Sequence, residues 1–146
     1  YTTDASGLSS TRAAAADPSK WLVLPEIISK EPLGPLVRHG DHQWGDVVRW
    51  SLNAMIIAEE LGVTSENVDA QKSSNVPEVL RLLGVEGSYG EMLELAPDWA
   101  YQIIKQIGNY SESYEANVGP DTPLEIARGL NALWTQGGIL YAPPFR

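Results

Sequence analysis

The 146-residue sequence has no cysteine, only two histidines and few basic residues, and each shortage excludes a class of function. Without cysteine there are no disulfides, thiolate zinc sites, iron–sulfur clusters or cysteine nucleophiles. Ten Lys and Arg against 19 Asp and Glu give a formal net charge of −9, which argues against nucleic acid or an anionic membrane surface as a partner. The longest purely apolar run, 54–58, is far shorter than the roughly 20 residues that span a bilayer.

What is present fits one domain, because 43% of the residues are apolar, enough for one sizeable core. The acidity is uneven along the chain. Residues 1–50 carry five basic and six acidic side chains, whereas 51–146 carry five and thirteen. The second part therefore holds most of the negative charge.

The beginning of the chain indicates a start in mid-fold, as in a fragment or a cleavage product. The β-prone residues 1–3 pass directly into a helix pattern that Asp4 is placed to cap. Further on, 21–28 has the apolar pattern of a buried strand, and 36–38 that of a second short strand. Two or three strands are too few for a stable sheet, so they need partners that this chain does not supply.

Helix patterns dominate the rest of the sequence. The strongest predicts a helix over 42–61, with apolar residues at three- and four-residue spacing, Asp41 as its cap and Gly62 at its end. The stripe formed by Trp44, Val48 and Met55 on this helix is expected to pack on the short strand at 36–38. A shorter helix is predicted to start within 64–68, others are predicted at 75–83, 89–95, 97–107 and 111–118, and a last one at 122–134. The last begins with a capping box, Thr122 to Glu125, with proline at its first helical position. The predicted fold class is α/β and helix-rich.

Asp4 is the most promising candidate for a ligand-binding residue. It stands between a strand pattern and a helix pattern, at the edge where open α/β sheets bind ligands. A carboxylate there can receive a ligand ammonium group through a charge-assisted hydrogen bond. The residues alone leave open the alternative that Asp4 is a simple helix cap.

Other candidates for chemistry have weaker support. Glu59 and Glu60 point about 100° apart on a helix and cannot form a facing acid–base pair. His39 and His42 lack a convincing third metal ligand, although a hydrolase using His42 with Asp41 or Asp46 is a remote alternative. The sequence has no nucleophile elbow and no phosphate-binding glycine loop, and the aromatic residues have core-compatible spacing. The residues therefore predict no catalytic site and no metal site.

Several long colinear blocks make the sequence resemble a known family. They are Tyr1-Thr-Thr-Asp-Ala-Ser-Gly-Leu-Ser-Ser-Thr-Arg12, Leu24-Pro-Glu-Ile-Ile-Ser-Lys-Glu-Pro-Leu-Gly-Pro35, Gln43-Trp44, Ala58-Glu-Glu-Leu-Gly-Val63, Gly129-Leu-Asn-Ala-Leu-Trp134 and Tyr141-Ala-Pro-Pro. With these blocks the chain resembles the C-terminal part of the general L-amino-acid (polar amino acid) substrate-binding protein of bacterial ATP-driven importers.

The resemblance implies part of a two-lobed type II periplasmic binding fold. Residues 1–25 would end the second lobe, 26–31 would cross between lobes, and 32–146 would form the C-terminal part of the first lobe with a helical extension. It implies capture of L-amino acids in the periplasm and delivery to membrane permease subunits, without covalent chemistry or a cofactor. Asp4 matches the position at which the family typically receives the α-ammonium group.

The family's carboxylate-clamping arginine lies in earlier segments, and neither Arg12 nor Arg38 is assigned as a substitute. A complementary N-terminal segment, or self-association, is therefore expected to complete the site. A different class of function also fits the charge pattern, namely a helix-rich interaction module whose acidic part, 51–146, docks a basic partner without a small-molecule ligand.

Overall fold

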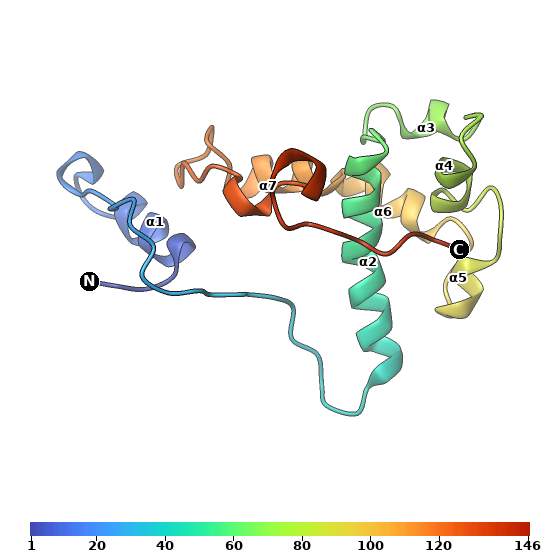
Figure 1. Cartoon of the computed structure of the whole chain (residues 1–146), viewed down its shortest axis with the longest axis horizontal. Helices are drawn as coiled ribbons and strands as arrows, with labels where there is room; N and C mark the ends of the chain where they lie inside the picture. The colour runs from blue at the N-terminus through green and yellow to red at the C-terminus, as the bar shows by residue number, and fades with distance from the viewer. The chain divides into compact units, whose positions relative to one another are not determined.

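The computed structural model describes residues 1–146, which divide into two compact units. Unit 1 comprises Tyr1–Pro35 with Tyr114–Arg128, and unit 2 comprises Leu36–Ser113 with Gly129–Arg146. The α-helices are α1 (Ala5–Ala13), α2 (His42–Glu60), α3 (Val68–Gln71), α4 (Pro77–Leu82), α5 (Tyr89–Met92), α6 (Trp99–Ile107) and α7 (Tyr110–Asn117) (Figure 1). Three 3-10 turns are η1 (Pro18–Lys20), η2 (Gly129–Asn131) and η3 (Trp134–Gln136). None of the helices combines the length and apolar character needed to cross a membrane.

Unit 2 is built around α2, which packs against α4 and α6. The Asp41 side chain accepts a hydrogen bond from the Trp44 amide at 3.1 Å and caps the first turn, and Gly62 follows the helix end with φ +68°. The helix predicted over 42–61 is thereby confirmed, and the shorter helices between 64 and 118 are present with bounds shifted by a few residues. The local apolar periodicity and the signals at the helix ends were sufficient to predict these helices.

The hydrophobic core lies entirely within unit 2. Its buried members are Ala54, Ile56, Ile57, Ala58, Val63, Val68, Val79, Leu82, Leu83, Trp99, Ala100, Ile104, Leu133, Ala142 and Phe145. They come from the second half of α2, from the helices around it and from the C-terminal tail. Unit 2 therefore has a core of its own.

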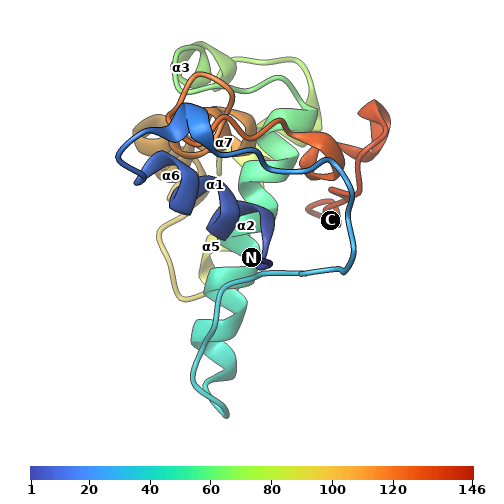
Figure 2. The same cartoon turned by 90° about the vertical axis from the view of Figure 1, so that its left-hand side faces the viewer.

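The first turns of α2 project beyond the other helices of unit 2 in two views at right angles (Figures 1 and 2), although the Gln43 side chain donates a hydrogen bond to the Leu93 carbonyl at 3.4 Å. Trp44, which the sequence pattern places on the packed face, is 55% exposed. We expected this face to pack on a strand at 36–38, but Leu36 is 98% exposed and 36–38 is not a strand. That packing prediction is wrong for the chain as described.

The strand predicted at 21–28 is also absent, and the only bridge pairing is an isolated parallel one between Leu133 and Leu140. Residues 21–37 are extended, with backbone hydrogen bonds confined to local turns, and Ile27 is 85% exposed. A β-strand exists only by pairing with another strand. The apolar pattern is therefore present, but the chain contains no neighbouring strand to satisfy it.

The helix predicted over 122–134 is a further correction. Thr122 does cap locally, because its hydroxyl accepts a hydrogen bond from the Leu124 amide at 3.2 Å. Glu125, however, has φ +52°, which is incompatible with a helix, and its carboxylate pairs with Arg12 at 2.6 Å. The Ile126 amide then bonds to the Val118 carbonyl, so the segment turns back instead of continuing as a helix.

Unit 1 contains α1 and no buried hydrophobic side chain. Within it, the Arg12–Glu125 ion pair connects α1 to the turn that follows α7. Both partners retain solvent access, at 24% and 61%, so the pair contributes little stability by itself. Unit 1 thus lacks the apolar burial that normally stabilises a folded domain.

Candidate ligand-binding site

The carboxylate of Asp4 lies at the N-terminus of α1, where the structure places it as the helix cap. Its Oδ1 accepts a hydrogen bond from the Gly7 amide at 2.8 Å and another from the Ser6 hydroxyl. The Thr3 hydroxyl donates to Oδ2 at 3.2 Å. A carboxylate offers about four acceptor positions, so three donors from the chain leave room for another.

These donors keep Asp4 ionised. The hydrogen bond from Ser6, followed by that from the Gly7 amide, holds the pKa of the Asp4 carboxyl below its ordinary value. The helix N-terminus also favours a negative charge at this position. An ionised carboxylate fixed by its neighbours is chemically suited to accept hydrogen bonds from an ammonium group.

Three residues that position Asp4 were missed by the sequence reasoning, namely Thr3, Ser6 and Gly7. A Cβ atom at Gly7 would lie 2.9 Å from Thr3 Cγ2 and 3.1 Å from Asp4 Oδ2, closer than side-chain atoms normally approach. Glycine therefore lets the Asp4 carboxylate fold back over the first turn of the helix. The run Thr-Asp-x-Ser-Gly carried this signal, because hydroxyl groups two residues from an Asx cap commonly bond to it.

Arg12 pairs with Glu125, and Glu59–Glu60 lie at the end of α2 in the other unit. The structure places no group of three or more His, Asp or Glu side chains where they could hold a metal ion. The first residue of α2 is His42, whose neighbour Asp41 uses its carboxylate to cap the helix.

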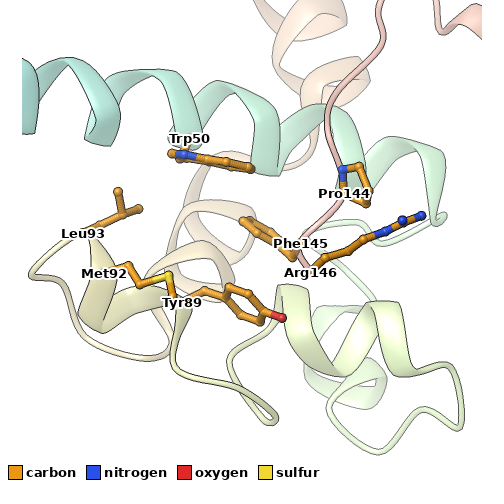
Figure 3. A pocket seen from close by; sticks show the side chains of 7 residues that line it. All are labelled: Trp50, Tyr89, Met92, Leu93, Pro144, Phe145 and Arg146. Carbon is orange, nitrogen blue, oxygen red and sulfur yellow. The ribbon is translucent and has the colours of Figure 1, made fainter.

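Most of the aromatic residues of unit 2 serve packing, as their spacing predicted. Phe145 of the C-terminal tail lies between Trp50 and Tyr89 and lines, together with them, a pocket of about 140 Å³ (Figure 3). Its ring centroid lies 5.3 Å from Trp50 and 5.5 Å from Tyr89, and 6.0 Å from Trp99 in an edge-on contact. Such distances are those of packed aromatic pairs.

Comparisons with known proteins give relatives along the whole chain, although no protein-family model matches. The chain is 56% identical over its full length to the glutamate/glutamine/aspartate/asparagine-binding protein BztA of Rhodobacter capsulatus, of which it covers 44%. It is 56% identical over 98% of its length to the putative amino-acid ABC transporter-binding protein YhdW of Escherichia coli, covering 42% of it. The general L-amino acid-binding periplasmic protein AapJ of Rhizobium johnstonii is 55% identical over the full chain, with 43% of its own length covered.

A solved structure is equally similar. An ABC transporter periplasmic binding protein from Brucella ovis, with glutathione bound, superposes over the full chain with a TM-score of 0.95 at 52% identity. The chain covers 46% of that protein. It thus spans less than half the length of each of these proteins.

The fold is therefore that of part of a periplasmic binding protein, which confirms the helix-rich partial fold implied by the resemblance. Within that class, the sequence is 55–56% identical to proteins named for amino-acid binding or amino-acid ABC transport. The strands expected of an α/β protein are the part of this fold that the chain by itself does not form.

Proposed function

We propose that this chain takes part in capturing L-amino acids in the periplasm and in delivering them to the membrane permease subunits of an ATP-driven importer. The observation that carries the proposal is 55–56% identity along the chain to proteins named for amino-acid binding or amino-acid ABC transport. Capture and release require no covalent chemistry, so the proposal assigns no enzymatic activity. The name of the relative AapJ supports the periplasmic location.

Asp4 is proposed to receive the α-ammonium group of the ligand. The support is its ionised carboxylate, fixed by Ser6 and Gly7 with acceptor capacity left over. An amino acid also has a carboxylate, which needs a cationic or amide clamp. Arg12 is engaged with Glu125, so the clamp is proposed to come from outside this chain.

A complementary N-terminal segment is therefore the proposed structural partner, with exchange between two copies of this chain as the other route to completion. Unit 1 has no buried hydrophobic side chain, and the neighbouring extended residues include Leu22, Ile27 and Ile28, each about four-fifths exposed. Pairing of 21–28 with strands of the added segment would satisfy both the backbone and these side chains. The division into a second lobe at 1–25, a crossing at 26–31 and a first lobe at 32–146 is proposed on the same basis.

The test is calorimetry on a chimaera that joins the N-terminal part of a 56%-identical relative to this chain, and on the chain alone. The probes are L-glutamine, L-glutamate, L-asparagine and glutathione, with N-acetyl-L-glutamine as the probe that lacks the ammonium charge. We expect micromolar binding by the chimaera, and at best about millimolar binding by the chain alone, about −4 kcal/mol. A chimaera that binds none of the probes would contradict the proposed function and favour an acidic interaction module.

The role of Asp4 is tested separately with Asp4→Asn in the chimaera. Asparagine still caps a helix, so the unfolding temperature should barely change. Affinity for L-glutamine should fall about 10- to 100-fold, because a hydrogen bond to a charged group is lost. Asp17→Asn is the matched control, since Asp17 is another carboxylate of unit 1 whose pKa is lowered by the Ser19 hydroxyl and Lys20. Unchanged affinity with reduced stability would assign Asp4 to capping alone.

A further inference from the structure

A second pocket of about 210 Å³ lies within unit 2 and has no part in the site at Asp4. Its floor is apolar and includes Ile57, Leu61 and Ala142. Two carboxylates, from Glu60 and Glu78, line it as well, together with the aromatic rings of Trp134 and Tyr141. An apolar pocket that combines carboxylates and aromatic faces favours a ligand that has both a positive charge and apolar groups.

The two rings stand nearly at right angles. Their centroids are 5.6 Å apart with an angle of 73° between the planes, and the residues are 50% and 70% exposed for Trp134 and Tyr141. Ring faces attract cations because their π-electron clouds are negative. Two accessible aromatic rings beside a carboxylate form the arrangement that binds organic ammonium groups elsewhere.

The charge of this pocket comes mainly from Glu60. The indole N–H of Trp134 donates a hydrogen bond to Glu60 Oε1 at 3.2 Å, which fixes the carboxylate beside the ring. Glu60 has no ion-pair partner, whereas Glu78 pairs with Arg81 at 3.3 Å. The pocket thus has one negative charge without a counter-ion, in a chain whose net charge is −9.

We propose that this pocket binds an organic cation, an alkylammonium or alkylguanidinium group, between Glu60 and the rings of Trp134 and Tyr141. The apolar floor contacts the methylene groups of the ligand, and Glu60 neutralises its head. A free α-amino acid is disfavoured here, because its own carboxylate would face Glu60. The pocket is therefore distinct in specificity from the site proposed at Asp4.

The test is nuclear magnetic resonance on the ¹⁵N-labelled chain 1–146, because the core of unit 2 is contained in this chain. The probe is n-butylammonium, and n-butanol is its uncharged isostere. The reporter is the indole N–H resonance of Trp134, assigned through Trp134→Phe. We expect a saturable shift with n-butylammonium at about 1–10 mM and a much smaller, non-saturating one with n-butanol.

Variants distinguish the proposed contacts from general electrostatic attraction. Glu60→Gln should weaken binding at least about fivefold, and Glu86→Gln, at an exposed residue outside the pocket, should leave it unchanged. Tyr141→Leu should weaken binding about threefold, whereas Tyr141→Phe keeps the ring and the affinity. Tyr141 is largely exposed, so this pair decides the question even if Glu60→Gln perturbs folding.

The source of the cation is resolved by two further probes, agmatine as a free small molecule and acetyl-Gly-Lys-Gly-amide as a protein side chain. Binding of agmatine alone assigns a small-molecule ligand, and binding of both extends the site to a basic side chain of a partner. Equal shifts with n-butylammonium and n-butanol, or equal losses from Glu60→Gln and Glu86→Gln, would overturn the proposal.

Discussion

Two glycines of unit 2 have the same backbone conformation and opposite surroundings. Gly62, after α2, has φ +68°, and Gly84, after α4, has φ +71°. A Cβ atom at Gly62 would meet nothing within 4 Å, whereas one at Gly84 would lie 1.9 Å from the carbonyl oxygen of Pro97 and 3.1 Å from the amide nitrogen of Asp98. Comparing the stability cost of alanine at the two positions therefore separates the backbone strain of a positive φ, which both share, from the steric clash, which only Gly84 has.

The expected magnitudes follow from these contacts. At Gly62, alanine costs about 1–2 kcal/mol for the left-handed conformation and recovers about 0.4–1 kcal/mol by restricting the unfolded chain, a net loss of about 1 kcal/mol. At Gly84 the same balance applies, but the Pro97 backbone, which precedes α6, must also move away. Overpacking of this kind costs about 1–3 kcal/mol, so the total at Gly84 is about 2–4 kcal/mol.

The measurement is urea unfolding of wild type, Gly62→Ala and Gly84→Ala, followed by tryptophan fluorescence and by circular dichroism. Unit 2 holds four of the five tryptophans, Trp44, Trp50, Trp99 and Trp134, so fluorescence reports mainly on this unit. The decisive quantity is the difference between the two variants, expected to be about 1–3 kcal/mol with equal m-values. Equal destabilisation by both variants would refute the argument that the α4–α6 connection is closed against Gly84.

Two further predictions concern the tail and a surface carboxylate of unit 2. Phe145→Ala removes a buried ring and should lower the free energy of unfolding by about 3 kcal/mol in the same assay, while Pro143→Ala, at an exposed residue, should be near neutral. Hydrogen bonds from Lys105 and Tyr101 lower the pKa of Asp69, so its contribution is present at neutral pH and is lost as pH falls through the lowered value. The unfolding midpoints of wild type and Asp69→Asn should therefore differ at pH 7 and converge below about pH 4; a difference that persists at low pH would contradict this.

Sequence patterns predicted the elements whose signals are local. In α2 the apolar spacing, the Asp41 cap and Gly62 all lie within 22 consecutive residues, and each is present in the structure. Pro77 and Gly84 bracket α4 in the same way. Such helices satisfy their own backbone groups, so nothing beyond the segment was needed to predict them.

Predictions failed where the decisive partner lies elsewhere in the chain or is absent from it. The capping box at Thr122 is intact as a sequence, yet the carboxylate of Glu125 is bound by Arg12, 113 residues away. No local pattern contains that pairing. The apolar residues at 21–28 have the pattern of a strand, but no strand forms there, because strand formation depends on backbone donors and acceptors of another strand.

In the candidate site, too, the features set by neighbouring residues could be predicted and those that depend on distant residues could not. The cap at Asp4 follows from neighbouring residues, and Thr3, Ser6 and Gly7 now explain why its carboxylate stays ionised and in place. Ligand capture needs a second set of donors for the carboxylate end of an amino acid, and these are a property of the whole binding protein. Sequence reasoning could therefore point to one half of the proposed site and to the charge that it carries.

The two proposed sites differ in how much they depend on the rest of the binding protein, because the hydrophobic core lies in only one of the two units. Glu60 and its aromatic neighbours belong to unit 2, whose buried side chains are all supplied by this chain. Asp4 belongs to unit 1, which contributes no buried hydrophobic side chain. Adding the complementary segment should therefore transform amino-acid binding at Asp4, whereas binding of n-butylammonium at Glu60 requires only the fold already present in the chain.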